Sequence, residues 1–171
     1  MGSMIGIARI PSPVGPLVLA ARDGRVCLLH FGDDTVAVRQ RLSAWYPAET
    51  IEPHADPAGG VSALDAYFAG NVEALDRIDV EFNGTPFQKR VWEALRLVRA
   101  GRTASYADLA RTIGHPNAVR AVGAANGANP VAVIVPCHRI IGSNGTLTGY
   151  GGGLERKRWL LEHEGCRLTF F

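Results

Sequence analysis

Short apolar or alternating segments separated by turn residues make up the first part of the chain. They cover residues 5–10, 17–21 and 26–31, and the Pro/Gly and Asp-Gly turns between them predict a small antiparallel meander. Asp34 is placed to cap a helix to about Tyr46, and a second helix is expected over 61–69. The stretch 47–60 predicts a loop, and 78–82 predicts one more strand or an extended connector.

Helical periodicity governs the second half. Thr85-Pro86 predicts a capped helix that reaches about Ala100, and Ser105 with Asp108 predicts a capping box for a helix ending at Ile113. The four-residue turn 114–117 then leads into a helix over 118–128. Two short helices joined by such a turn have the outline of a helix-turn-helix, which generic helix pairs share. The seam at Asn83-Gly84 divides the chain into predicted domains 1–82 and 83–171.

Charge is distributed unevenly between these halves. Residues 1–81 hold 6 Lys/Arg and 11 Asp/Glu, whereas residues 82–171 hold 12 Lys/Arg and 5 Asp/Glu. A basic half fits contact with a polyanion such as nucleic acid, and two surfaces of opposite sign that attract each other across a domain contact fit equally well. No apolar run is long enough to cross a bilayer, so a soluble intracellular protein without a membrane partner is expected.

The composition of the helix over 118–128 favours the nucleic-acid interpretation. It consists mostly of Ala, Gly and Val, with Arg120 as its only charge. Such a helix approaches another surface closely while projecting one long cation, which suits the narrow minor groove better than the major groove.

Candidate chemistry is concentrated in Pro136-Cys137-His138-Arg139-Ile140. A thiolate is the useful nucleophile, so Cys137 needs a base nearby. Successive side chains of an extended segment point to opposite faces, so His138 would reach the sulfur through a sharp turn or a water molecule. Glu164 then either fixes the imidazole tautomer as the third member of a triad or merely decorates a helix end. Three cysteines without close spacing predict neither a disulfide framework nor a metal cluster.

The order of these motifs resembles the O6-alkylguanine-DNA alkyltransferases. The resemblance is carried by Tyr106, Arg120, Asn129-Pro130, the Pro136–Arg139 motif, Gly149-Tyr150-Gly151-Gly152-Gly153 and Glu164. It covers roughly residues 82–171 and extends only loosely into the first half. It implies an α/β N-terminal domain with a small antiparallel sheet, ribonuclease H-like, and a mainly α C-terminal domain with a helix-turn-helix, winged-helix-like. It also implies repair of double-stranded DNA by irreversible transfer of an alkyl group from O6-alkylguanine, and from O4-alkylthymine, to Cys137 after base flipping.

The resemblance also implies roles for individual residues. Arg120 would occupy the space left by the extruded base, Asn129 would tie the recognition helix to an active-site strand, and Arg139 would form a structural ion pair. Asn126 replaces an apolar pocket residue of some relatives, and Gly151 stands where relatives often have Ser. The catalytic residues would be Cys137, His138 and Glu164, the substrate pocket would use Tyr106, Asn129, Ile140, Tyr150 and Gly151, and DNA would meet Arg120, Tyr106, Ala121, Gly123 and Ala124.

The resulting expectation is a cytoplasmic, single-turnover methyltransferase without cofactor or metal, monomeric and cooperative on DNA. Two alternatives stay open: a non-catalytic protein that binds the alkyl lesion, and a cysteine hydrolase acting through Cys137, His138 and Glu164. The hydrolase leaves the basic half and Arg120 unexplained.

Overall fold

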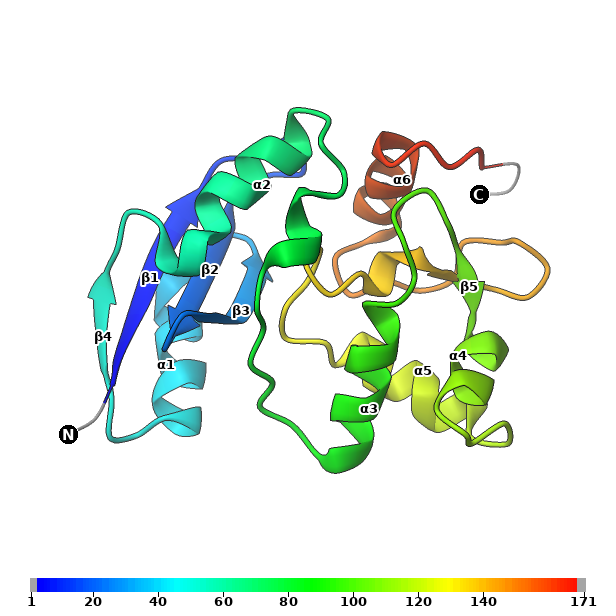
Figure 1. Ribbon diagram of the computed structural model, residues 1–171, viewed down its shortest axis with the longest axis horizontal. Helices are drawn as coiled ribbons and strands as arrows, with labels where there is room; N and C mark the ends of the chain where they lie inside the picture. Colours follow the sequence, from blue (N-terminus) through cyan, green and yellow to red (C-terminus); the bar gives the residue numbers. More distant parts are fainter. Residues whose placement is uncertain (1–2, 169–171) are drawn as a thin grey trace. The chain divides into compact units, whose positions relative to one another are not determined.

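The computed structural model describes residues 3–168, which form two compact units (Figure 1). The N-terminal unit comprises residues 3–83 together with Pro130–Ile134, and the C-terminal unit comprises residues 84–129 and 135–168. The short segment Pro130–Ile134 is therefore part of the first unit although its neighbours along the chain belong to the second. Among the described residues, none of the helices combines the length and apolarity that crossing a bilayer requires.

A four-stranded sheet in the order β3-β2-β1-β4 organises the N-terminal unit. The pairs β1–β2 and β2–β3 are antiparallel, which confirms the predicted meander, whereas β4 runs parallel to β1 and makes the sheet mixed. The loop expected over 47–60 is therefore wrong in part, because β4 is a short and mostly exposed strand with no apolar alternation to reveal it. The strands are β1 (Met4–Ile10), β2 (Leu17–Arg22), β3 (Arg25–Phe31) and β4 (Thr50–Pro53).

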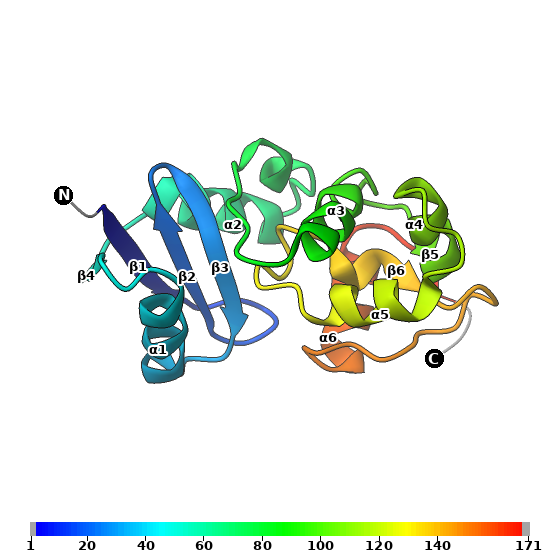
Figure 2. The ribbon, with the colours of Figure 1, turned by 90° about the horizontal axis from the view of Figure 1, so that it is seen from below.

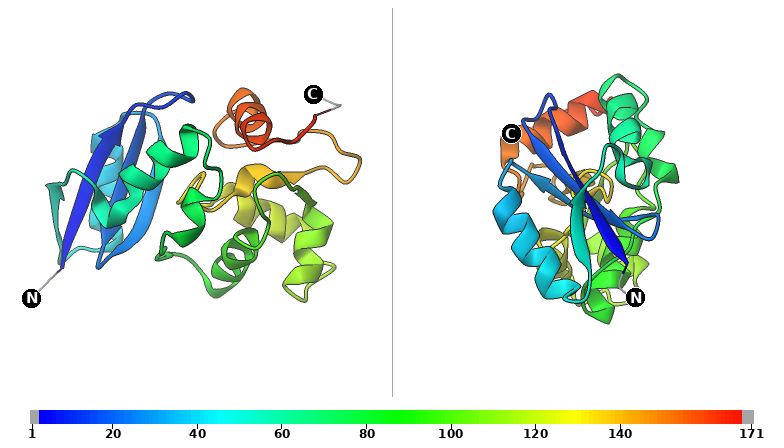
Figure 3. Two further views of the ribbon diagram at one scale, coloured as in Figure 1. Left: turned by 45° about the horizontal axis from the view of Figure 1, so that its top comes forward. Right: turned by 90° about the vertical axis from the view of Figure 1, so that its left-hand side faces the viewer.

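Two helices cover opposite faces of this sheet, α1 (Thr35–Trp45) and α2 (Gly60–Phe68) (Figures 2 and 3). The Asp34 side chain accepts a hydrogen bond from the Ala37 amide and so caps α1 as predicted. Successive side chains of β2 point to opposite faces of the sheet. Val18 packs in the cluster that contains α1, and Leu19 lies against α2, where a Cβ added at Gly60 would come within 2.5 Å of it. The sheet is consequently buried on both sides.

Extended backbone outside the named strands completes the edge at β3. Val80 forms an isolated bridge with Val26, which confirms the extended connector expected over 78–82. Leu29 donates to the Pro130 carbonyl at 3.0 Å and accepts from the Ala132 amide at 3.2 Å. The segment Pro130–Ile134 thereby covers the open edge of the sheet.

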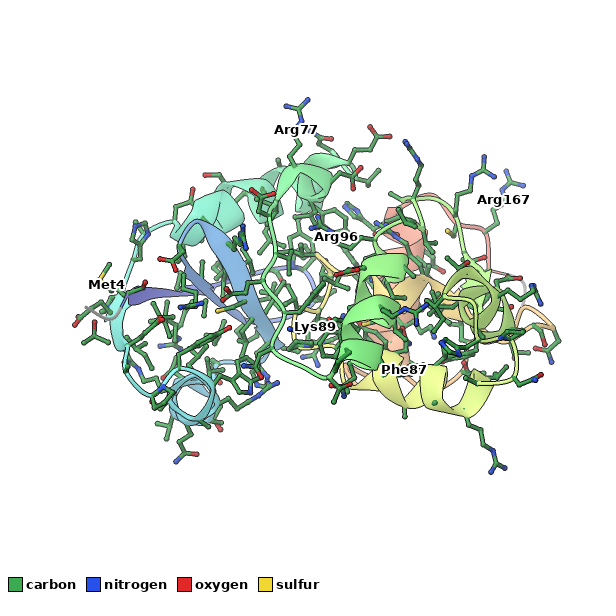
Figure 4. All side chains as sticks on the ribbon, turned by 60° about the horizontal axis from the view of Figure 1, so that its bottom comes forward. Met4, Arg77, Phe87, Lys89, Arg96 and Arg167 are labelled. Carbon is green, nitrogen blue, oxygen red and sulfur yellow. The ribbon has the colours of Figure 1, made fainter. Side chains whose placement is uncertain are left out.

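The C-terminal unit is mainly helical. Its first helix, α3 (Pro86–Leu95), begins with the Thr85–Gln88 capping box, and Phe87 and Lys89 project from its first turns (Figure 4). It ends five residues before the expected Ala100, since the chain turns there through short-range bonds and Gly101 adopts a φ of 84°. The remaining elements are β5 (Ala104–Ser105), α4 (Tyr106–Thr112), α5 (Val119–Gly127), β6 (Ile140–Ile141), which pairs parallel with β5, and α6 (Leu154–His163).

Candidate active site

Helices α4 and α5 form the predicted pair joined by a tight turn. Ser105 and Asp108 make the predicted capping box at the start of α4, and Trp92 on α3 holds α5 by donating to the Ala125 carbonyl at 2.8 Å. The buried face of α5 contains Val122, Ala125 and Asn126. Its outward face is smooth and carries a single long cation, because Arg120, Ala121 and Ala124 are exposed.

Tyr106 connects this helix pair to the glycine-rich loop. Its hydroxyl lies 3.1 Å from the Thr148 hydroxyl, and its ring lies beside Gly123, where an added Cβ would approach it to 3.8 Å. A side chain as small as alanine would fit at Gly123 in ordinary contact with Tyr106, and the two residues predicted to face DNA are neighbours in the structure.

Cys137 lies on a 3₁₀ turn, Cys137–Arg139, and is only 6% exposed. The sequence interpretation assumed an extended segment after an active-site strand, and this is wrong: Val131 forms only an isolated bridge, residues 132–135 form a turn and a bend, and Val133 has a φ of 69°. In a 3₁₀ turn, with three residues per turn, successive side chains do not alternate between opposite faces as they do in a strand, so Cys137 and His138 need not face opposite ways. Asn129 ties α5 to this turn rather than to a strand, since its Nδ2 lies 2.8 Å from the Val135 carbonyl oxygen and 3.1 Å from Sγ of Cys137.

The thiol is held in its neutral form by its surroundings. Burial raises the pKa of Cys137 above its ordinary value, although hydrogen bonds from the side chains of Asn129 and Tyr150 and the charge of Lys157 act in the opposite direction. The groups needed to stabilise a thiolate are thus present around a sulfur that remains protonated at rest.

His138 and Glu164 form a buried pair. Nε2 of His138 lies 2.8 Å from Oε2 of Glu164, and both side chains are fully buried. Burial lowers the pKa of His138, so the imidazole is neutral and able to accept a proton. With Nε2 on the carboxylate, Nδ1 is the nitrogen left to act as base, and it has no hydrogen-bond partner within the described residues.

Arg139 holds the Glu164 carboxylate from the other side. Its Nε lies 2.8 Å from Oε1 and its Nη2 lies 2.9 Å from Oε2, while Nη1 donates to the Val98 carbonyl at 2.6 Å. Burial alone would raise the pKa of Glu164, but the hydrogen bonds from His138 and Arg139 outweigh it and lower that pKa to about 2. The predicted ion pair of Arg139 is confirmed, and its partner is the carboxylate that orients His138.

Lys157 is a site residue that the sequence interpretation missed. It is fully buried on α6, and its Nζ donates to the Ile140 carbonyl at 2.6 Å and to the Thr148 carbonyl at 3.2 Å. Burial lowers its pKa to about 8. A detectable signal did exist, because a lysine three and four residues before the buried Leu160 and Leu161 falls on the apolar face of the helix.

The loop over 142–153 is held at its start and near its middle. Gly142 donates to the Thr146 carbonyl at 2.9 Å, and an added Cβ there would come within 2.9 Å of the Thr146 hydroxyl, whereas Lys157 donates to the Thr148 carbonyl. Tyr150 carries its ring 5.9 Å from the Lys157 ammonium. Gly151 is exposed, and an added Cβ there would meet nothing within 4 Å, so the serine found in relatives would fit.

The structure therefore brings together most of the predicted pocket. Asn129 and Tyr150 contact Cys137, and Ile140 contributes a buried carbonyl to the same cluster through Lys157, whereas His138 is held by Glu164. Arg120, Ala121 and Ala124 lie apart from the thiol on the outward face of α5. No group of three or more metal-ligating side chains occurs within residues 3–168.

Comparisons with known proteins cover both units. Residues 7–82 match the sequence model of the 6-O-methylguanine DNA methyltransferase ribonuclease-like domain, and residues 86–166 match that of the 6-O-methylguanine DNA methyltransferase DNA binding domain. The methylated-DNA–protein-cysteine methyltransferase of Salmonella typhimurium is 46% identical over 163 residues, which are 94% of this chain and 95% of that protein. The protein of the same name from Mycobacterium tuberculosis is 47% identical over 172 residues, covering 98% and 99% of the two chains.

Solved structures agree with these matches. The crystal structure of Mycobacterium tuberculosis OGT in complex with DNA superposes with a TM-score of 0.77 at 44% identity, covering 94% of this chain and 92% of that one. The O6-methylguanine-DNA methyltransferase of Pyrococcus kodakaraensis superposes with a TM-score of 0.64 at 26% identity, covering 95% and 99%. The predicted fold class and the family resemblance are confirmed.

Proposed function

The chain belongs to the methylated-DNA–protein-cysteine methyltransferase family, and from that membership we propose that it repairs DNA by transferring an alkyl group to its own Cys137. The substrate is O6-alkylguanine in double-stranded DNA, with O4-alkylthymine as a second lesion. The observation that carries the proposal is the buried Cys137 thiol followed directly in the chain by a buried, neutral imidazole, which an ionised carboxylate holds.

In this proposal the C-terminal unit binds DNA. The smooth outward face of α5 enters the minor groove, Ala121, Gly123 and Ala124 allow close approach, and Arg120 fills the gap left by the extruded base. Flipping the base costs a few kcal/mol, and less for a lesion that is already mispaired. Arg120 offsets part of this cost, while Tyr106 at the start of α4 assists rotation and contacts the flipped ring.

The transfer step is a displacement at the alkyl carbon. His138 removes the thiol proton through a bridging water and the sulfur attacks the carbon, so that a C–S bond forms as the C–O6 bond breaks. The electron pair of that bond passes to the guanine ring, which takes up the proton and leaves as ordinary guanine. Glu164 stabilises the imidazolium, and Lys157 with the Asn129 and Tyr150 side chains stabilises the thiolate.

The product explains single turnover. A thioether resists hydrolysis, so one chain repairs one lesion. We propose domains 1–82 and 83–171, on either side of the seam that the two matched regions leave open. We also propose a monomer that binds DNA cooperatively, acts in the cytoplasm on chromosomal DNA, and needs no cofactor.

Intact-mass spectrometry after incubation with a duplex containing O6-methylguanine tests the proposal. We expect one methyl group per chain, mapped to the peptide that carries Cys137, and no further gain with excess substrate. Cys137→Ala should prevent the gain while fluorescence anisotropy shows retained DNA affinity. Cys27→Ser and Cys166→Ser are the matched controls and should still be methylated.

The same experiment separates the alternatives. A lesion-binding protein shows affinity without any mass gain, and a cysteine hydrolase shows turnover of an ester or amide without a stable adduct. A methyl group on Cys27 or Cys166 in the Cys137→Ala variant would refute the assignment of the nucleophile.

A further inference from the structure

The side chain of Arg90 joins α3 to the turn that precedes α5. Helix α3 packs beside both α4 and α5 (Figure 1). Nη2 of Arg90 donates to the Ile113 carbonyl, and Nη1 donates to Nε2 of His115 at 3.1 Å, since a guanidinium has no acceptor. Phe87, one turn earlier on α3, sets its ring edge-on to the same imidazole, with the ring centroids 6.2 Å apart. The turn is therefore held from α3 at two points.

The turn itself ends α4 in a defined way. The amides of Gly114 and His115 donate to carbonyls in the last turn of α4 at 3.0 and 2.9 Å, which forms a Schellman motif with Gly114 at a φ of 78°. Ile113 is the C-cap of α4, and its carbonyl is one of those that a helix end leaves without an intrahelical partner. Arg90 supplies that partner from a different helix.

The start of α5 depends on this turn. Its N-cap residue, Ala118, has no side chain that could cap the helix, and the Ala118 amide donates to the His115 carbonyl at 2.9 Å. Only Pro116 and Asn117 lie between these two residues, and the proline ring fixes its own φ. Arg120 is the second residue of α5. A displacement of His115 is consequently passed on to Arg120.

Two side chains of α3 thus fix the two ends of α5. Trp92 is buried and donates to the Ala125 carbonyl near the end of α5, whereas Arg90 is exposed and acts just before its start. Both terminal nitrogens of Arg90 are directed at protein acceptors. Serving two acceptors at once requires the rigid fork of a guanidinium, which an ammonium does not reproduce. The geometry is that of a clamp rather than of a surface charge.

We propose that Arg90 is a positioning residue for alkyl transfer from duplex DNA: by holding the turn at Ile113 and His115, it sets the direction in which α5 presents Arg120 to the duplex. This inference rests on the proposed function. A misplacement of about 1 Å far from the chemistry costs on the order of a hundredfold in rate. Loss of the clamp affects only a reaction in which a base must be flipped, so free substrate should not sense it.

Single-turnover kinetics with a duplex containing O6-methylguanine and with free O6-benzylguanine tests the clamp. For Arg90→Ala we expect the limiting rate on the duplex to fall about tenfold, while the half-saturating concentration and the reaction with the free base stay at their wild-type values. Arg90→Lys keeps the charge without the fork and should not restore the rate. Arg102→Ala removes another exposed arginine of the same unit and is the matched control, with both reactions unchanged.

His115→Ala removes the same contact from the other side and should lose duplex rate in the same way, and circular dichroism with thermal melting shows that each variant is folded. Full rescue by Arg90→Lys, or a salt dependence of duplex binding that is shallower by about one in Arg90→Ala, would make Arg90 a phosphate contact and overturn the inference. An unchanged duplex rate, or equal losses on both substrates, would overturn it too. Failure of the wild type to take any methyl group from O6-methylguanine would instead overturn the proposed function, and this inference with it.

Discussion

Replacing Glu164 by glutamine tests the electrostatic core of the site. The substitution keeps the shape of the side chain and removes its charge, so the Arg139 guanidinium loses the carboxylate that pairs it in a buried position. Glutamine keeps one acceptor oxygen, so it cannot accept from both His138 and Arg139 as the two carboxylate oxygens do. Both the stability of the fold and the rate of alkyl transfer should therefore respond.

The size of the stability effect follows from the pKa of Glu164. Its pKa falls from an ordinary 4.5 to about 2, and at about 1.4 kcal/mol per pKa unit this gives roughly 3 kcal/mol of stabilisation at neutral pH. Because the folded-state pKa is depressed, this contribution is complete above the unfolded-state value and is lost as pH falls through the folded-state value. Between pH 7 and about pH 3, roughly 2 kcal/mol of it should disappear.

Urea unfolding of the wild type and Glu164→Gln at both pH values measures this loss. Other carboxylates titrate in both proteins, so the difference between the two proteins isolates Glu164. We expect the stability gap between them to be about 2 kcal/mol smaller at pH 3 than at pH 7. A gap that is the same at both pH values would show that Glu164 does not stabilise the folded protein through its charge, and the argument for an ionised carboxylate behind His138 would be refuted.

The remaining predictions concern the groups around the thiol and one helix cap. Arg120→Ala should lose repair of O6-alkylguanine in duplex DNA while its reaction with free O6-benzylguanine, measured by mass, stays within about tenfold of the wild type; equal losses on both substrates would contradict the role in flipping. Lys157→Met should move the rise of the alkylation rate to higher pH, since the charge that lowers the pKa of Cys137 is removed; an unchanged pH profile would place Lys157 outside the electrostatics of the site. Thr85→Ala should cost about 1 kcal/mol in urea unfolding through loss of the capping box on α3, and unaltered stability would show that this cap is not formed in solution.

Local signals in the sequence were sufficient for the helices and for the main chemistry. Capping residues such as Asp34 and Ser105 act within one helical turn, so their effect can be predicted from neighbouring residues. The family resemblance, rather than spacing, predicted the set of Cys137, His138 and Glu164, and the structure brings His138 and Glu164 within hydrogen-bond distance. The helix caps depend on short-range geometry. The His138–Glu164 pair is a single long-range contact between an imidazole and a carboxylate, two groups that commonly form hydrogen bonds.

The features that escaped prediction depend on contacts distant in sequence. β4 is a strand only because its backbone pairs with β1, and its own side chains carry no pattern. The turn at Cys137 follows the turn and bend of residues 132–135. The apolar sequence of residues 131–135 does not reveal that turn. Helical spacing could place Lys157 on the buried face of α6, but the two carbonyls that accept from its ammonium, those of Ile140 and Thr148, could not be predicted from it.

Because Pro130–Ile134 belongs to the N-terminal unit, that unit cannot be completed during synthesis until these residues leave the ribosome. A ribosome delivers all four strands of the sheet, and the segment at Val80 that pairs with Val26, long before residue 130. The part of the β3 edge at Leu29 therefore stays uncovered until Pro130–Ile134 is synthesised. Exposed strand edges are sites where chains pair with one another. The nascent chain is therefore at its most vulnerable to self-association until Leu29 can pair with the segment at Val131, and the last step in closing the first unit waits for residues encoded just before the reactive cysteine.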